Sequence, residues 1–139
     1  MTDPYNLQRF VDAQAGVIDQ VRSELRAGRK QSHWMWFIFP QLRGLGSSPM
    51  AERYGISSRA EAELYLAHPV LGPRLRECTE IANAVQDASV EDIFGYPDDL
   101  KFRSSMTLFS AVTDDNGVFR AALEKYFKGQ PDPKTVARL

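Results

Sequence analysis

Apolar residues recur at spacings of three and four along most of the chain, with polar residues between them. Near the N-terminus the apolar positions are Leu7, Phe10, Val11, Ala15, Val17, Ile18, Val21 and Leu25. This spacing places the apolar side chains on one face of an amphipathic helix. Asp3 and Pro4 are typical of a helix start, and Gly28 is typical of a helix end. The pattern therefore predicts a first helix between Asp3 and Gly28.

The rest of the chain predicts further helices joined by short loops. Ser58 and Glu61 have the spacing of a capping box and predict a helix that ends before Pro69. Other helical patterns cover residues 71–85, 90–94, 98–112 and 116–127, and a last short one starts at 132. The sequence therefore predicts an all-α fold of about seven or eight helices. We expect one single compact domain over residues 1–139.

The segment 34–39 holds both tryptophans of the chain and no polar side chain other than the indole N–H groups. Ser32 is a candidate cap for a short helix here, and Pro40 would end that helix. A strand is the alternative, because aromatic residues favour strands and periodicity does not decide between the two. We expect a helix, since no other segment offers a convincing partner strand. We also expect this helix to lie in the interior, with the polar residues at its ends facing a shared hollow.

Composition and charge narrow the function classes. The chain has 139 residues, of which 43% are hydrophobic, as in an ordinary globular domain. Lys and Arg number 17 against 18 Asp and Glu, so the basic excess of a nucleic-acid-binding protein is missing. The longest apolar run, 34–39, is far shorter than the roughly 20 residues of a membrane span. With Cys78 as its only cysteine, the chain is expected in the cytoplasm, without nucleic-acid or membrane partners.

Polar residues beside the aromatic segment are candidate ligand contacts. His33 could act as an acid, a base or a ligand, or it could simply pack on the aromatic cluster. The loop 44–48 could present backbone N–H groups to an anion, with Arg43 supplying charge, or it could be a simple turn. Trp36 could stack on a flat ligand or belong to the core. The candidate contacts from this part of the chain are His33, Trp36, Gln41, Arg43, Gly44 and Gly46.

A second group of candidates lies on one predicted helix. Lys101 stands three and four residues before Ser104 and Ser105, a spacing at which a lysine could activate a serine hydroxyl. Alternatively this polar face is solvated, or the serines allow another helix to approach closely. With Thr107, these residues could form the second wall of a pocket. The two histidines have no Cys or carboxylate at ligand spacing, so we predict no metal site and no cofactor.

Four pieces of the chain resemble a known bacterial family. They are the segment 28–41, the loop 44–46, the segment 68–75 and the segment 101–109. Together they are similar to the domain-of-unknown-function family 1810, over nearly the whole chain. The resemblance implies a compact, mainly helical, cytosolic protein and implies no established activity. Some members are labelled calpastatin, but that inhibitor is largely disordered, and this composition is typical of a folded domain.

Two hypotheses of function follow from these patterns. In the first, the protein binds a small phosphate-bearing or nucleotide-like molecule and could act on it. This hypothesis predicts that His33, Lys101 and Ser105 converge on one concave site. In the second, the protein is a non-catalytic binding or adaptor domain that uses an exposed apolar helix face. That hypothesis predicts a contiguous apolar patch of roughly several hundred Å². The sequence leaves open whether any reaction is catalysed, and also the oligomeric state.

Overall fold

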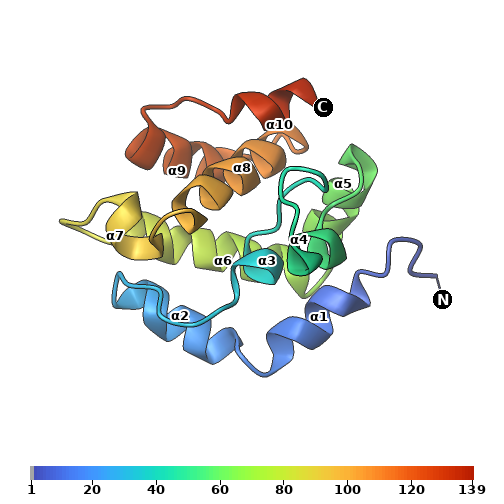
Figure 1. The fold of residues 1–139 in the computed structure, drawn as a ribbon, viewed down its shortest axis with the longest axis horizontal. Helices are drawn as coiled ribbons and strands as arrows, with labels where there is room; N and C mark the ends of the chain where they lie inside the picture. The colour runs from blue at the N-terminus through green and yellow to red at the C-terminus, as the bar shows by residue number, and fades with distance from the viewer. Residues whose placement is uncertain (1) are drawn as a thin grey trace.

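The computed structural model describes residues 2–139, which form ten helices (Figure 1). In chain order they are α1 (Gln8–Ala15), α2 (Ile18–Arg26), α3 (Met35–Ile38), α4 (Pro49–Tyr54), α5 (Arg59–Ala67), α6 (Leu71–Ala84), α7 (Val90–Phe94), α8 (Asp98–Ala111), α9 (Gly117–Phe127) and α10 (Pro133–Ala137). The only β-type pairing in this range is one isolated parallel bridge between Leu42 and Ile56. The fold is therefore all-α, as the sequence predicts.

The helices pack as one body around two long central helices. α6 packs against α2, α5 and α9, and α8 packs against α5, α7, α9 and α10. In Figure 1, α1 and α2 lie along one side, α8, α9 and α10 lie along the other, and α3 and α4 lie between them. One continuous apolar core joins residues from α1 through α9. The tryptophan segment is thus enclosed by elements from both halves of the chain.

The first predicted helix is in fact two helices. α1 ends at Ala15 and α2 begins at Ile18, because Val17 has φ −129°, outside the helical range. Fully buried residues lie on both sides of the break, so the apolar spacing alone does not reveal it. A further helix, α4, lies where the sequence predicts only a loop, and its N-terminus is capped by the Ser48 side chain. These two differences explain why the described chain has ten helices rather than seven or eight.

Glu61 departs slightly from the predicted capping box. The Ser58 side chain does accept a hydrogen bond from the Glu61 N–H and so begins α5. The Glu61 carboxylate, however, accepts from the backbone N–H and the hydroxyl of Ser57, one residue earlier than expected. It also accepts from Arg9 Nη2 at 2.9 Å, although it is only 1% exposed. This buried carboxylate therefore links α1 to α5 as well as capping α5.

The tryptophan segment lies in the interior, as expected. Trp34 and Phe39 are each 1% exposed, and Trp36 is half-buried. The helical part is short, Met35–Ile38, and the alternative of a strand is wrong for this segment. The Phe39 ring meets the Phe102 ring edge to face, with 5.0 Å between their centroids. Such aromatic contacts fix α3 against α8.

The buried carboxylate of Glu24, on α2, binds the segment that precedes α3. Its Oε1 accepts from the backbone N–H groups of Gln31 and Ser32, at 2.7 and 3.0 Å. The same oxygen accepts from Trp34 Nε1 at 3.0 Å. Oε2 accepts from the Ser32 hydroxyl at 2.6 Å and from Gln20 Nε2 at 2.8 Å. The prediction that Ser32 caps α3 is therefore wrong, because its hydroxyl donates to Glu24 instead.

These hydrogen bonds keep Glu24 ionised. Burial alone would raise the pKa of its carboxyl, because the charged form loses solvation. The donors from Ser32, Gln31 and Gln20 outweigh that effect and lower the pKa from 4.5 to about 2. The carboxylate is thus charged at neutral pH while only 5% exposed.

The other end of α3 is held by Gln14, a buried residue of α1. Its Nε2 donates to the Phe37 carbonyl at 2.7 Å and to the Tyr65 hydroxyl at 3.2 Å. Its Oε1 accepts from Arg74 Nη1 at 3.3 Å. Both ends of α3 are therefore tied by buried side chains of the two N-terminal helices.

Gly72 should tolerate no side chain. A Cβ built at this position would stand 2.0 Å from the backbone oxygen of Leu66, where α5 leads into α6. We expect Gly72→Ala to lower the free energy of unfolding by about 3 kcal/mol or more, because backbone would have to move. Gly117→Ala is the matched control, since nothing lies within 4 Å of its Cβ position. Its urea unfolding curve should stay within about 1 kcal/mol of the parent; equal losses in the two variants would contradict the close approach.

Glu24→Gln should destabilise the protein in a pH-dependent way. The folded pKa, about 2, lies below the unfolded value of 4.5, so the carboxylate stabilises the fold above pH 4.5. That contribution disappears as the pH falls from 4.5 towards 2. We expect urea unfolding to show a difference of about 3 kcal/mol from the parent at pH 7, narrowing strongly by pH 2.5. The exposed Glu80→Gln is the control, and a Glu24→Gln deficit that is the same at every pH would refute this explanation.

Candidate functional site

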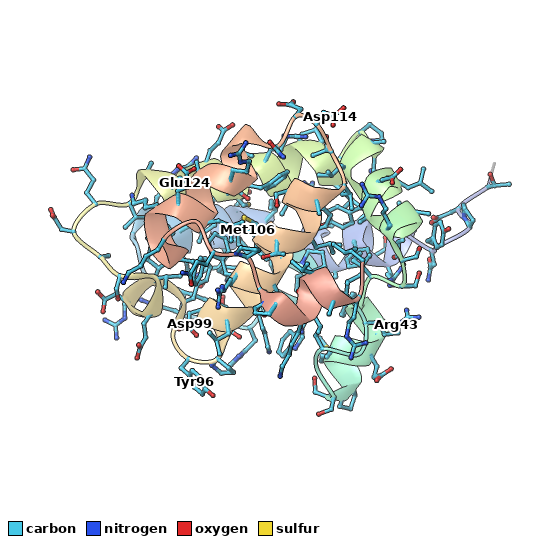
Figure 2. The ribbon with its side chains drawn as sticks, turned by 90° about the horizontal axis from the view of Figure 1, so that it is seen from above. Arg43, Tyr96, Asp99, Met106, Asp114 and Glu124 are labelled. Carbon is cyan, nitrogen blue, oxygen red and sulfur yellow. The ribbon has the colours of Figure 1, made fainter. Side chains whose placement is uncertain are left out.

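A cavity of about 380 Å³ opens between the loop after Pro40, the first half of α8 and the segment that leads into α10. We call it the lysine cleft. Its lining residues are Gln41, Leu45, Gly46, Pro97, Leu100, Lys101, Arg103, Ser104, Asp132 and Lys134. Figure 2 shows α8, which carries Asp99 and Met106, passing beneath the C-terminal segment. The cleft therefore joins three segments that are far apart in the sequence.

Lys101 is held in a defined position at this cleft. Its Nζ lies 5.3 Å from the centroid of the Trp36 ring and 3.6 Å from Asp98 Oδ1. Asp98 Oδ2 lies 2.9 Å from Lys30 Nζ, so one carboxylate serves two lysines. Each lysine lies over a tryptophan, since Lys30 Nζ is 5.2 Å from the Trp34 ring centroid. Because Asp98 is shared, it only partly neutralises the charge of Lys101.

Two other charged residues of the cleft hold the C-terminal segment in place. Arg103 donates from Nε and Nη2 to the backbone carbonyls of residues 130–131, both at 3.1 Å. Asp132 Oδ2 accepts from the Ser104 hydroxyl at 3.0 Å. The same oxygen accepts from the Thr135 hydroxyl at 2.6 Å and from its N–H at 3.2 Å, which caps α10. Arg103 and Asp132 are thus structural ties, whereas Lys134 is exposed beside them.

A small recess of about 10 Å³ adjoins the cleft, sharing Gln41 and Lys101 with it. Trp36 lines this recess. Its Nε1 is buried and has no hydrogen-bond partner within residues 2–139. Buried N–H groups in proteins nearly always have a partner. Trp36 therefore carries a buried donor without a partner in the described range, on a residue that lines the recess beside the cleft.

The structure brings together about half of the candidate contacts. Gln41, Gly46, Lys101 and Ser104 line the lysine cleft, and Trp36 lines the adjoining recess. His33 is exposed and lines none of the described cavities. Arg43 lines a second cavity, where Gly44 packs against the Arg138 side chain. The expected convergence of His33, Lys101 and Ser105 on one concave site does not occur.

The hydroxyl groups of Ser104, Ser105 and Thr107 on α8 are either bonded to other parts of the protein or buried in its core. Ser105 is fully buried, and its Oγ has no hydrogen-bond partner in the described part of the chain. Successive helical residues point about 100° apart, so Ser105 faces the core while Ser104 faces the cleft. Thr107 Oγ1 donates to the Arg103 carbonyl and accepts from the Asp132 N–H at 2.8 Å. The interpretation of Ser104 and Ser105 as a lysine-activated nucleophile therefore has no support, because one hydroxyl is bound to Asp132 and the other is sealed.

Other potential nucleophiles and ligands are also constrained. Burial raises the pKa of the Cys78 thiol to about 12, so this group is not a reactive thiolate at neutral pH. Within residues 2–139, no three His, Cys, Asp or Glu side chains are grouped closely enough to hold a metal ion. None of the helices in that range is both long and apolar enough to cross a lipid bilayer.

Sequence reasoning misses several residues of the cleft. Lys134 and Asp132 enter it only because α10 folds back onto α8, a contact that no local pattern encodes. The Asp132–Pro133 pair does signal the start of α10, and Asp132 caps that helix as expected. Pro97 and Leu100 also line the cleft beside Lys101, and their apolar side chains give no indication of a binding site in the sequence. Glu24 is missed altogether, because a glutamate on an amphipathic helix is ordinarily exposed.

Two comparisons with known proteins agree with this description. The family model described as "Protein of unknown function (DUF1810)" matches residues 4–139. The crystal structure of the conserved hypothetical protein Rv1873 from Mycobacterium tuberculosis is 64% identical and has a TM-score of 0.98, covering 99% of this chain and 98% of that chain. A comparison with curated proteins found no match. The family resemblance and the fold are therefore confirmed, and neither comparison assigns an activity.

The two adjacent serines of α8 should respond differently to removal of the hydroxyl group. Ser104→Ala deletes a donor to the Asp132 carboxylate, and we expect the free energy of unfolding to fall by about 1–2 kcal/mol. Ser105→Ala deletes a buried hydroxyl that has no partner within residues 2–139, so stability should be unchanged or higher. Urea unfolding of both variants measures the difference. A larger loss for Ser105→Ala than for Ser104→Ala would contradict the assigned contacts.

Proposed function

The chain belongs to the DUF1810 family of proteins of unknown function, and we propose that it binds a small phosphate-bearing, nucleotide-like molecule in the lysine cleft. The observation that carries the proposal is the approach of Lys101 and Lys134, from two distant segments, to one cavity of about 380 Å³. That volume lies within the range of small-molecule sites. The charge of the lining residues and the volume of the cleft together suggest a small anionic ligand.

The charge balance of the cleft favours an anion. Its lining contains three cations, Lys101, Arg103 and Lys134, against one carboxylate, Asp132, which gives a formal charge of +2. Asp132 already accepts hydrogen bonds from Ser104 and Thr135, which disperse its negative charge. A concave surface with an excess of one charge concentrates ions of the opposite sign. A phosphate group could pair with Lys101 and Lys134 while the rest of the ligand occupies the cleft.

Aromatic and amide groups beside the cleft suit a flat, polar ring. Tyr96 is 76% exposed and directly precedes Pro97, which lines the cleft. Figure 2 shows Tyr96 projecting at the same end of the molecule as Asp99 of α8. An exposed aromatic ring of this kind can stack on a nucleobase. Gln41, which lines both the recess and the cleft, could provide hydrogen bonds to ring or sugar atoms.

The alternative, an adaptor domain with an exposed apolar helix face, receives less support. The large apolar residues that are exposed in the described range are Leu64, Tyr96, Leu100, Val136 and Leu139. They come from α5, from the start of α8 and from the C-terminal segment, so they do not form one helical face. Two of them, Tyr96 and Leu100, adjoin the cleft and fit the ligand hypothesis equally well.

A thermal-shift screen with nucleotides and sugar phosphates tests the proposal. A ligand at a hundred times its Kd stabilises the folded protein by about 2.7 kcal/mol, which raises the melting temperature by roughly 10 °C. Lys101→Gln combined with Lys134→Gln should remove this shift, because both cations are lost from the cleft. Without ligand, the melting temperatures of the parent and the variant should differ only by the small contribution of the lost Lys101–Asp98 contact.

The control for charge is Lys128→Gln, an exposed lysine outside the described cavities. This variant should keep the full thermal shift. Trp36 fluorescence provides an independent readout, since its ring adjoins the cleft while Trp34 is buried. A ligand shift that persists in the double lysine variant would place the ligand elsewhere, and a screen of these two compound classes without any shift would count against the proposed ligand class.

A further inference from the structure

The loop that contributes Gly46 to the lysine cleft also contributes Arg43 to a second cavity, of about 360 Å³. We call it the arginine cavity. Its lining residues are Leu42, Arg43, Ser57, Ser58, Arg59, Arg138 and Leu139. Figure 2 shows Arg43 beside the C-terminal helix. This cavity shares no lining residue with the lysine cleft.

Three arginines from separate segments meet at the arginine cavity. Arg43 precedes α4, Arg59 begins α5 and Arg138 follows α10. Arg59 is engaged, because its Nη2 donates to the Ala111 carbonyl at 2.8 Å and its Nε lies 3.3 Å from a Glu63 carboxylate oxygen. The Arg43 guanidinium makes one long hydrogen bond, 3.3 Å from Nη2 to the Gly55 carbonyl. Two of the three guanidinium groups thus retain most of their donors.

Neither Arg43 nor Arg138 has a carboxylate within 4 Å among residues 2–139. The Arg138 guanidinium instead packs on the backbone at Gly44, where a Cβ would stand 3.0 Å from Nη1. Gly44 also has φ +96°, a conformation that L side chains rarely adopt. Because residue 44 is a glycine, the Arg138 guanidinium can lie directly on the loop that carries Arg43.

Like charges around one cavity repel each other unless a counter-charge relieves them. Guanidinium groups match the oxygens of a phosphate group, because each can donate two parallel hydrogen bonds. The cavity also adjoins the first turn of α5, a nine-residue helix whose N-terminus begins at Ser58 and Arg59. The helix dipole at this end favours an anion as well, and the Glu61 carboxylate already occupies the part of it next to Ser57. Arginine geometry and helix orientation therefore point to the same ligand chemistry.

We propose that the arginine cavity binds a phosphate or phosphate-ester group through Arg43 and Arg138, as an anion site separate from the lysine cleft. The two sites lie on either flank of one glycine-containing loop, since Gly46 lines the lysine cleft and Gly44 contacts Arg138. The second site does not depend on the proposed function of the first. Each can fail without the other.

Titration with inorganic phosphate, at constant ionic strength set with potassium chloride, tests this site. We expect the backbone amide NMR signals of Gly44, Ser58 and Arg59 to shift in a saturable way. Arg43→Gln combined with Arg138→Gln should raise the apparent Kd for these shifts at least tenfold. Both arginines are exposed, so this variant should fold, and unchanged amide spectra elsewhere verify that it does.

Two further variants separate this site from its neighbour and from bulk charge. Arg26→Gln removes an exposed arginine of α2 that lines no described cavity, and it should leave the titration unchanged. Lys101→Gln combined with Lys134→Gln should leave the Gly44, Ser58 and Arg59 shifts unchanged too. Shifts that never saturate, that survive the double arginine variant, or that vanish in the double lysine variant would each overturn the proposal.

Discussion

One buried carboxylate, that of Glu24, organises the centre of this protein. The segment 28–34 that leads to α3 has no regular secondary structure, so its backbone N–H groups need partners from elsewhere. Glu24 accepts from two of them, from the Ser32 hydroxyl and from the Trp34 indole. A buried charge is tolerated only when donors surround it in this way. The carboxylate and the segment therefore stabilise each other, and each would be unfavourable alone.

The same constraint positions the lysine cleft. Once Trp34 is fixed on Glu24, the short helix α3 places Trp36 half-buried beneath Lys101. Lys30, which precedes the bound segment, reaches Asp98 at the start of α8, and Asp98 in turn lies 3.6 Å from Lys101. A continuous set of contacts therefore runs from the buried carboxylate to the cation that we propose binds the ligand. These contacts hold one side of the cleft, whereas its other wall depends on the docking of α10 onto α8.

The fold class can be predicted from the sequence because apolar spacing and helix caps are local properties. The break at Val17 cannot, since the apolar stripe continues across it. Lys101 is identified as a candidate from its neighbours on one helix, but Lys134 joins it only through the long-range contact of α10 with α8. The prediction that Ser105 lines a pocket is wrong, because residue spacing shows which face of a helix a side chain lies on and not what covers that face. The part played by Glu24 depends on a loop conformation that no residue pattern specifies.

The most direct test of this account is a measurement of the Glu24 carboxyl group itself. Carbon-detected NMR of glutamate side chains, followed from pH 7 to the lowest pH at which the protein stays folded, reports the ionisation of each carboxyl group. We expect the Glu24 signal to titrate with a pKa of about 2, far below its usual 4.5. A Glu24 signal that titrates near 4.5 or above would show that the carboxylate does not hold the tryptophan segment as described.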